Sequence, residues 1–245
     1  MFDLQIDDGV AWLRIGRPEA RNAIPLQGWD RLAEAVLQAA EASVLILAGE
    51  PGGTFCAGAD ISDFERLQAE PEARTEFREA IRGGLGALRA SPVPSIALVE
   101  GACYGAGVAL AMACDIRVAS PAASFSITPA KLGISYPQED VHRLLSLVGP
   151  GQAARLLYGA EAIDGAEATR IGLAEIVAGE AEAAARALAG AIAANEPASI
   201  ATLKRGIQLA AEGCVQDEGQ DRAFEDLFGS EAVERRLAGY RRRAR

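Results

Sequence analysis

Two loops of small residues carry the groups best suited to chemistry in this sequence. Residues 53–60 (GTFCAGAD) follow a buried apolar segment and precede a helical pattern, and residues 101–107 (GACYGAG) have the same context. Amide N–H groups at a helix start lack intrahelical partners, and small side chains let a ligand approach them. If the loops lie side by side, they direct two N–H donors at one oxygen, which is the arrangement of an oxyanion hole.

Residues 136–142 contain four side chains that could move a proton. Tyr136 is interpreted either as an active-site phenol or as a ring whose hydroxyl is satisfied elsewhere in a pocket wall. Glu139 is a candidate acid or base, or a carboxylate favoured by the dipole of the helix that begins there. Asp140 has the same two interpretations. His142, the single histidine, is interpreted as structural.

The hydrophobic pattern predicts the elements that position these groups. Alternation over residues 2–6 and 10–15 predicts a β-hairpin. Further strands are expected at 44–48, 95–99, 115–119, 124–127 and 174–177, and helices at 25–41, from 61, at 72–90 and at 106–113. From residue 138 the chain is mainly helical, with breaks near 149–151, 159, 164–165 and 195–197. We therefore expect an α/β core over 1–190 and a helical subdomain over 191–245.

Composition excludes several other classes of protein. The chain has 245 residues and a formal charge of -10, which argues against general nucleic-acid binding. Four dispersed cysteines and one histidine disfavour a metal site. We find no apolar leader and no membrane-spanning run, and no dinucleotide or phosphate-binding glycine fingerprint. A reduced, cytoplasmic enzyme is the expectation.

The chain resembles the crotonase (enoyl-CoA hydratase/isomerase) family along nearly its whole length. The matching segments are 17–23, 55–61, 99–110, 114–119, 132–134, 148–149, 166–168 and 172–174. This resemblance implies a crotonase, ClpP-like spiral of β-β-α units with a C-terminal helical trimerisation region, as a homotrimer or a dimer of trimers. It also implies an acyl-CoA thioester as substrate. No separate cofactor is expected, because coenzyme A is part of that substrate.

The resemblance also assigns roles to residues. The amides of Ala59 and Ala106 correspond to the oxyanion-hole donors that stabilise a thioester enolate, and Ala57 and Gly58 border the path of the adenine and pantetheine groups. The remaining expected substrate contacts are Arg21, Asp60, Ile61, Gly105, Ala109, Pro129 and Ile134. Asp60 is also interpreted as a helix cap. Arg21, Lys204 and the cluster 241–243 are candidates for the coenzyme A phosphates.

Two positions depart from the hydratase pattern. Hydratases of the family use two glutamates, and here Ala109 and Pro129 stand in those places, so neither can transfer a proton. Residues 125–129 and 132–136 resemble methylmalonyl-CoA decarboxylases, in which a tyrosine lies near the leaving carboxylate. Four functions stay open: hydration or isomerisation through Glu139 or Tyr136, decarboxylation of a malonyl-type CoA, thioester hydrolysis, and acyl-CoA binding without catalysis.

Overall fold

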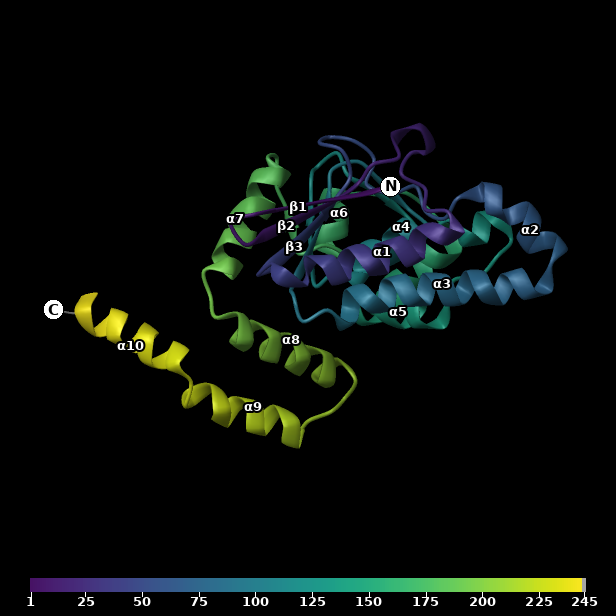
Figure 1. Cartoon of the computed structure of the whole chain (residues 1–245). Helices are drawn as coiled ribbons and strands as arrows, with labels where there is room; N and C mark the ends of the chain where they lie inside the picture. Colours follow the sequence, from purple (N-terminus) through teal and green to yellow (C-terminus); the bar gives the residue numbers. More distant parts are fainter. Residues whose placement is uncertain (244–245) are drawn as a thin grey trace.

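A six-stranded sheet forms the centre of the molecule in this computed structural model, which describes residues 1–243. Its strands lie in the order β1-β2-β3-β4-β6-β9, and Figure 1 labels the first three of them. Their bounds are β1 Phe2–Asp7, β2 Val10–Ile15, β3 Val44–Ala48, β4 Ser95–Val99, β6 Ile116–Ala119 and β9 Ile176–Val177. β1 and β2 form the predicted antiparallel hairpin, and the other neighbours pair parallel. The strands expected at 44–48, 95–99 and 115–119 are confirmed.

A second, three-stranded sheet was only partly predictable. It has the order β5-β7-β8 and consists of β5 Ala102–Tyr104, β7 Ser124–Ser126 and β8 Ile163–Asp164. The interpretation of residues 101–107 as a loop alone was wrong, because β5 pairs parallel with β7. Strands of two or three residues are too short to show an alternating pattern, so β5 and β8 leave no signal in the sequence.

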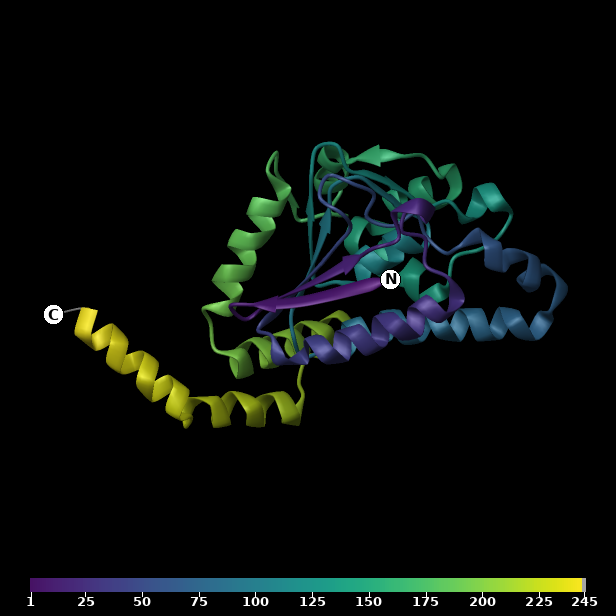
Figure 2. The same ribbon diagram turned by 45° about the horizontal axis from the view of Figure 1, so that its top comes forward.

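Helices cover both faces of the six-stranded sheet (Figures 1 and 2). On one face Leu13, Leu45 and Leu47 join a buried cluster with α1, α3, α4 and α5. On the other face Trp12 and Ile46 pack against α7. The helix bounds are α1 Leu26–Gln38, α2 Phe64–Ala69, α3 Pro71–Ala90, α4 Ala106–Ala113, α5 Gln138–Gly159, α6 Gly165–Arg170 and α7 Ala181–Ala193. Burial on both faces explains why the central strands are continuously apolar.

Three helices follow the core toward the C-terminus, and the last two of them extend away from it (Figure 1). They are α8 Pro197–Ala211, α9 Glu218–Phe228 and α10 Glu231–Arg243. Lys204 fixes α8 to the core, because its Nζ lies 2.8 Å from Asp115 Oδ2 and donates to Val93 O at 3.0 Å. The predicted helical C-terminal region is therefore present. The proposed division after residue 190 falls in the last turn of α7 and stays a prediction. Within residues 1–243, no helix is long and apolar enough to cross a membrane.

Candidate active site

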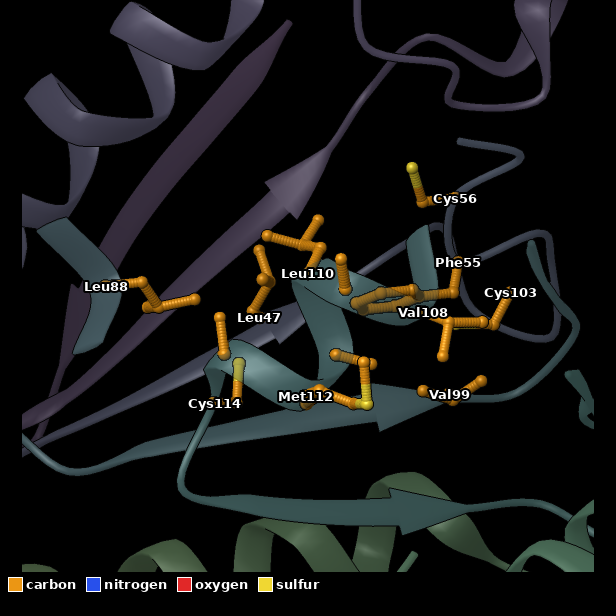
Figure 3. Packing of buried hydrophobic residues seen from close by; sticks show 14 of the residues in the cluster. Leu47, Phe55, Cys56, Leu88, Val99, Cys103, Val108, Leu110, Met112 and Cys114 are labelled. Carbon is orange, nitrogen blue, oxygen red and sulfur yellow. The ribbon is translucent and has the colours of Figure 1, made fainter. Parts of the chain in front are cut away.

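The structure places the two loops of small residues side by side. Cys56 N donates to Ala102 O at 3.1 Å, and Tyr104 N donates to Cys56 O at 2.9 Å. α4 begins immediately after this junction, and a Cβ added to Gly107 would lie 2.3 Å from Cys56 O. Only glycine allows the helix to approach the first loop so closely. Figure 3 shows Phe55 of the first loop in the same packed cluster as Val108 of α4.

At this junction, the amides of Ala59 and Ala106 have no acceptor among the described residues. Their neighbours are paired, because Asp60 N donates to Ile24 O at 2.9 Å and Gly105 N donates to Ser126 O at 2.9 Å. Ala106 is the first residue of α4, so its N–H has no intrahelical partner and carries part of the positive end of the helix dipole. Both amides are therefore available to a ligand oxygen.

Ala59 and Ala106 both lie in the wall of an apolar cavity of about 420 Å³. Of the predicted site residues, its wall contains Ala57, Gly58, Ala59, Ile61, Gly105, Ala106, Ala109, Pro129, Ile134 and Tyr136. The sequence reasoning missed Phe64, Phe77, Arg78, Ile81, Thr128, Leu132, Ser135 and Pro137, which complete the wall with Asp140. The apolar residues of α2 and α3 recur with helical periodicity, which does not distinguish a face packed in the core from one that lines a cavity.

Asp60 and Arg21 do not line the cavity. Asp60 pairs with Arg17, and its Oδ1 accepts from Ser62 N at 3.0 Å. The hydrogen bond from Ser62 N, more than the Arg17 guanidinium, holds the pKa of this carboxyl below its usual value. Asp60 therefore caps the helical turn Ile61–Asp63. Arg21 is exposed in a left-handed conformation, and its carbonyl accepts from Ala57 N at 3.0 Å.

Glu139 is also absent from the cavity wall, so its role as the acid or base stays a prediction that this geometry does not favour. Its Oε1 accepts from Arg82 Nε of α3 at 2.8 Å, and this hydrogen bond lowers the pKa of Glu139. A carboxylate held in this way is a weaker base. Successive residues of a helix point about 100° apart, so the neighbouring Asp140 takes the inward direction that Glu139 does not.

Asp140 is the carboxyl group of the cavity wall. The residue is 2% exposed, and its Oδ1 is buried with no hydrogen-bond partner among the described residues. Burial raises the pKa of Asp140 to about 6, and the nearby Glu139 also raises it, whereas Arg89 and Arg143 oppose the rise. A buried, unpaired carboxyl on the wall of a cavity is a candidate proton-transfer group.

Tyr136 lines the cavity, but its hydroxyl is engaged. The OH donates to Gly105 O at 2.9 Å. Burial raises the pKa of the phenol well above its ordinary value, and the Asp140 carboxyl adds to this rise, so the group remains a donor at neutral pH. The accepting carbonyl belongs to the peptide whose N–H is that of Ala106. Tyr136 therefore helps to hold the Ala106 amide in position, and its hydroxyl already has a hydrogen-bond partner in the cavity wall.

Replacing Tyr136 with phenylalanine tests this positioning. Gly105 O keeps the bond from Val108 N at 3.0 Å, so the carbonyl is not left unpaired. We expect the free energy of unfolding to fall by about 1 kcal/mol, and kcat to fall roughly fivefold with KM unchanged. Chemical denaturation and steady-state kinetics on whichever thioester turns over measure the two effects. An unchanged kcat would remove the hydroxyl from the function of this site.

The basic residues considered for phosphate contact are differently placed. Lys204 is 6% exposed and pairs with Asp115, so it is not available to a ligand. Asp115 has the structural role expected of it, because its Oδ2 also accepts from Ser95 N at 2.7 Å. The cluster at 241–243 ends α10, and Arg245 lies outside the described residues. His142 is exposed on α5 and is not part of the cavity wall.

Comparison with known proteins identifies the family. The family model for enoyl-CoA hydratase/isomerase matches residues 5–243. The probable enoyl-CoA hydratase EchA6 of Mycobacterium bovis is 32% identical over 95% of this chain and 93% of its own length. A crotonyl-CoA hydratase of Syntrophomonas wolfei is 38% identical over 69% of this chain and 66% of its own.

Solved structures agree with this assignment. An enoyl-CoA hydratase/isomerase family protein of Hyphomonas neptunium is 35% identical, with a TM-score of 0.93 over 99% of this chain and 95% of that one. An enoyl-CoA hydratase/carnithine racemase of Magnetospirillum magneticum has a TM-score of 0.93 at 27% identity, over 99% of this chain and 92% of that one. The chain belongs to the enoyl-CoA hydratase/isomerase family, the crotonase superfamily. Its expected α/β crotonase fold is confirmed.

Proposed function

We propose that this chain binds the thioester carbonyl of an acyl-CoA through the amides of Ala59 and Ala106 and stabilises the enolate derived from it. The observation that carries the proposal is the pair of partner-free amides at the wall of an apolar cavity. Two fixed donors aimed at one oxygen stabilise an anion as it develops, and one such donor is typically worth about 10²–10³ in rate. The apolar wall suits an acyl group.

The assembly we propose is a homotrimer or a dimer of trimers in the cytoplasm. Apolar side chains on the extended helices support it: Phe224 is 62% exposed, Phe228 69% and Ile207 72%. Exposed apolar faces of this kind mark contacts between subunits. Coenzyme A enters as part of the substrate, so the proposal includes no separate cofactor.

Among the reactions that this function allows, hydration by two carboxylates has the least support. Ala109 and Pro129 line the cavity and cannot titrate. The same lack of acid–base groups favours decarboxylation of a malonyl-type CoA, because the hole alone can stabilise the enolate that remains after CO₂ leaves. Asp140 opposes that second candidate. A carboxylate in the wall would repel the free carboxylate of the substrate, and the hydroxyl of Tyr136 is already bound to Gly105 O.

The binding of a carbonyl by the two amides can be tested directly. Butyryl-CoA is compared with its thioether analogue S-butyl-CoA, which lacks only the carbonyl oxygen, and with free coenzyme A. By isothermal titration we expect the thioester to bind about tenfold or more tightly than the thioether, because two hydrogen bonds are lost. Equal affinities of thioester and thioether would refute the proposed hole.

Incubation with methylmalonyl-CoA and ethylmalonyl-CoA separates the remaining reactions. We expect no release of CO₂ above background, and release from either substrate would establish the decarboxylase. If the chain binds acyl-CoA thioesters tightly but turns over none of a broad panel, it is a binding protein without catalysis.

A further inference from the structure

We propose that a second cavity, formed where α3, α4, α5 and α8 meet, binds a small dianion between the guanidinium groups of Arg89 and Arg143. The class of ligand is a phosphate or a dicarboxylate. Among the described residues, none lines both this cavity and the apolar cavity of Ala59 and Ala106. The inference therefore goes beyond the proposed function and does not depend on it.

The second cavity is held open by bonds between distant parts of the chain. It has a volume of about 510 Å³, and the end of α8 forms one of its walls. Gln208 of α8 fixes that wall, because its Nε2 donates to Arg89 O of α3 at 2.7 Å. Lys204, one turn earlier on α8, is fixed by its ion pair with Asp115 after α4. The space between these helices is therefore part of the fold.

Arg143 of α5 brings an unpaired donor to this cavity. Its Nη1 donates to Met112 O at 3.2 Å, but its buried Nε has no acceptor among residues 1–243. Burial lowers the pKa of Arg143, and the guanidinium of Arg89 lowers it further. A buried cation with an unpaired donor and a second cation nearby is unfavourable until an anion joins the two.

Two other charged residues of the wall already have partners of opposite charge. Arg117 pairs with Glu175, and its Nε donates to Leu173 O at 2.9 Å. Asp115 pairs with Lys204. Neither residue can therefore supply or neutralise charge in the cavity.

Arg89 and Arg143 form no ion pair with any described residue. The remaining titratable residues of the wall, His142 and Glu212, are exposed to solvent. A guanidinium is a planar fork of donors that matches the oxygens of a phosphate or a carboxylate. Because two such cations are uncompensated, the cavity fits an anion with two negative charges.

Asp140 connects this cavity with the first one. It lies in the wall of the first cavity, and both Arg89 and Arg143 lower its pKa. A dianion bound between these arginines offsets their field at Asp140. In return, the ionised Asp140 carboxylate weakens the binding of the dianion, because coupling between two sites is reciprocal.

Isothermal titration with inorganic phosphate and with succinate tests the site at pH 8, with the ionic strength held constant by NaCl. We expect the parent to bind at least one of them with a Kd of about 1 mM or tighter. Arg89→Gln and Arg143→Gln should each weaken binding about tenfold or more. Arg31→Gln is the control, because it removes the same charge from an exposed position on α1 outside both cavities. Its affinity should stay within about twofold of the parent.

The coupling to Asp140 gives a second measurement that does not remove an arginine. Asp140→Asn should bind the same anion a few-fold more tightly than the parent at pH 8. Glu139→Gln removes an equal charge from the adjacent residue, which pairs with Arg82 outside the cavity, and should have a smaller effect. Thermal melts report that each variant is folded.

The result also names the class of ligand. Binding of phosphate alone indicates a phosphate ligand, and binding of succinate alone indicates a dicarboxylate. If the parent binds neither anion at millimolar concentrations, or if Arg31→Gln weakens binding as much as Arg143→Gln does, the site is refuted. If neither anion binds and Arg143→Gln lowers the mass measured by sedimentation, the counter-charge is a carboxylate of a second copy, and the proposal of a free anion is wrong.

Discussion

Replacing Gly58 with alanine is expected to lower kcat by about 10²–10³, the effect of losing one oxyanion donor. Gly58 has φ +109°, a conformation that side chains rarely adopt. An added Cβ would lie 2.9 Å from Tyr104 O and 3.3 Å from Ala106 N. Both neighbours are backbone atoms, so the contact is relieved only by moving the two loops apart. That movement separates the amides of Ala59 and Ala106.

Gly52→Ala is the matched control for this experiment. Gly52 also has a positive φ, +66°, in the same segment between β3 and the cavity, but an added Cβ would meet nothing within 4 Å. Both variants therefore carry backbone strain, and only Gly58→Ala crowds the site. Thermal melts of the two variants measure the loss of stability caused by backbone strain, and steady-state kinetics measure the loss of kcat. A kcat of Gly58→Ala within threefold of that of Gly52→Ala would contradict the assignment of the donors.

Asp140→Asn is expected to stabilise the protein at pH 8 by up to about 3 kcal/mol and to lose this advantage near pH 4. The pKa of Asp140 rises from the ordinary 3.8 of an aspartate to about 6 through burial. The folded state therefore binds this proton more tightly than the unfolded chain does. The stability it contributes is fully present below about pH 4 and is lost as pH rises through about 6.

The size of this effect follows from the same pKa values. A step from 3.8 to about 6 is about 3 kcal/mol at about 1.4 kcal/mol for each tenfold change. Asparagine carries no charge at any pH, so the variant avoids that cost above pH 6. Urea denaturation at pH 4, 6 and 8 measures the difference, with Glu139→Gln as the control. If the difference in stability between Asp140→Asn and the parent did not change with pH, burial would not be destabilising the ionised Asp140 carboxylate.

Sequence alone identified the two loops because their signal is local. A buried strand, a run of small residues and a helix occur twice, and strands of this kind bring their following loops to one edge of a parallel sheet. The structure indeed joins Cys56 to Ala102 and Tyr104 there. The long central strands and the helices were predictable for the same reason: each repeats its pattern over at least four or five residues.

The sequence could not predict which of Glu139 and Asp140 faces the cavity. Both are carboxylates in the first turn of α5, and the direction of each depends on the phase at which the helix begins after Pro137. Arg82, which donates to the Glu139 carboxylate, is 57 residues away in sequence. Only the assembled packing of α3 against α5 decides which acid meets the cavity, and no periodicity within either helix contains that information.

The burial of α4 has a consequence for how this family member can diversify. Every residue of α4 after Ala106 is buried, so a substitution there disturbs the core as well as the site. Across the cavity, Phe64 and Phe77 come from α2 and α3, whose outer faces meet solvent. The α4 half of the site is thus tied more closely to the stability of the whole protein than the half formed by Phe64 and Phe77. If the proposed function holds, we expect substitutions in that outer half to change which acyl groups fit without altering the segment around Ala59 and Ala106.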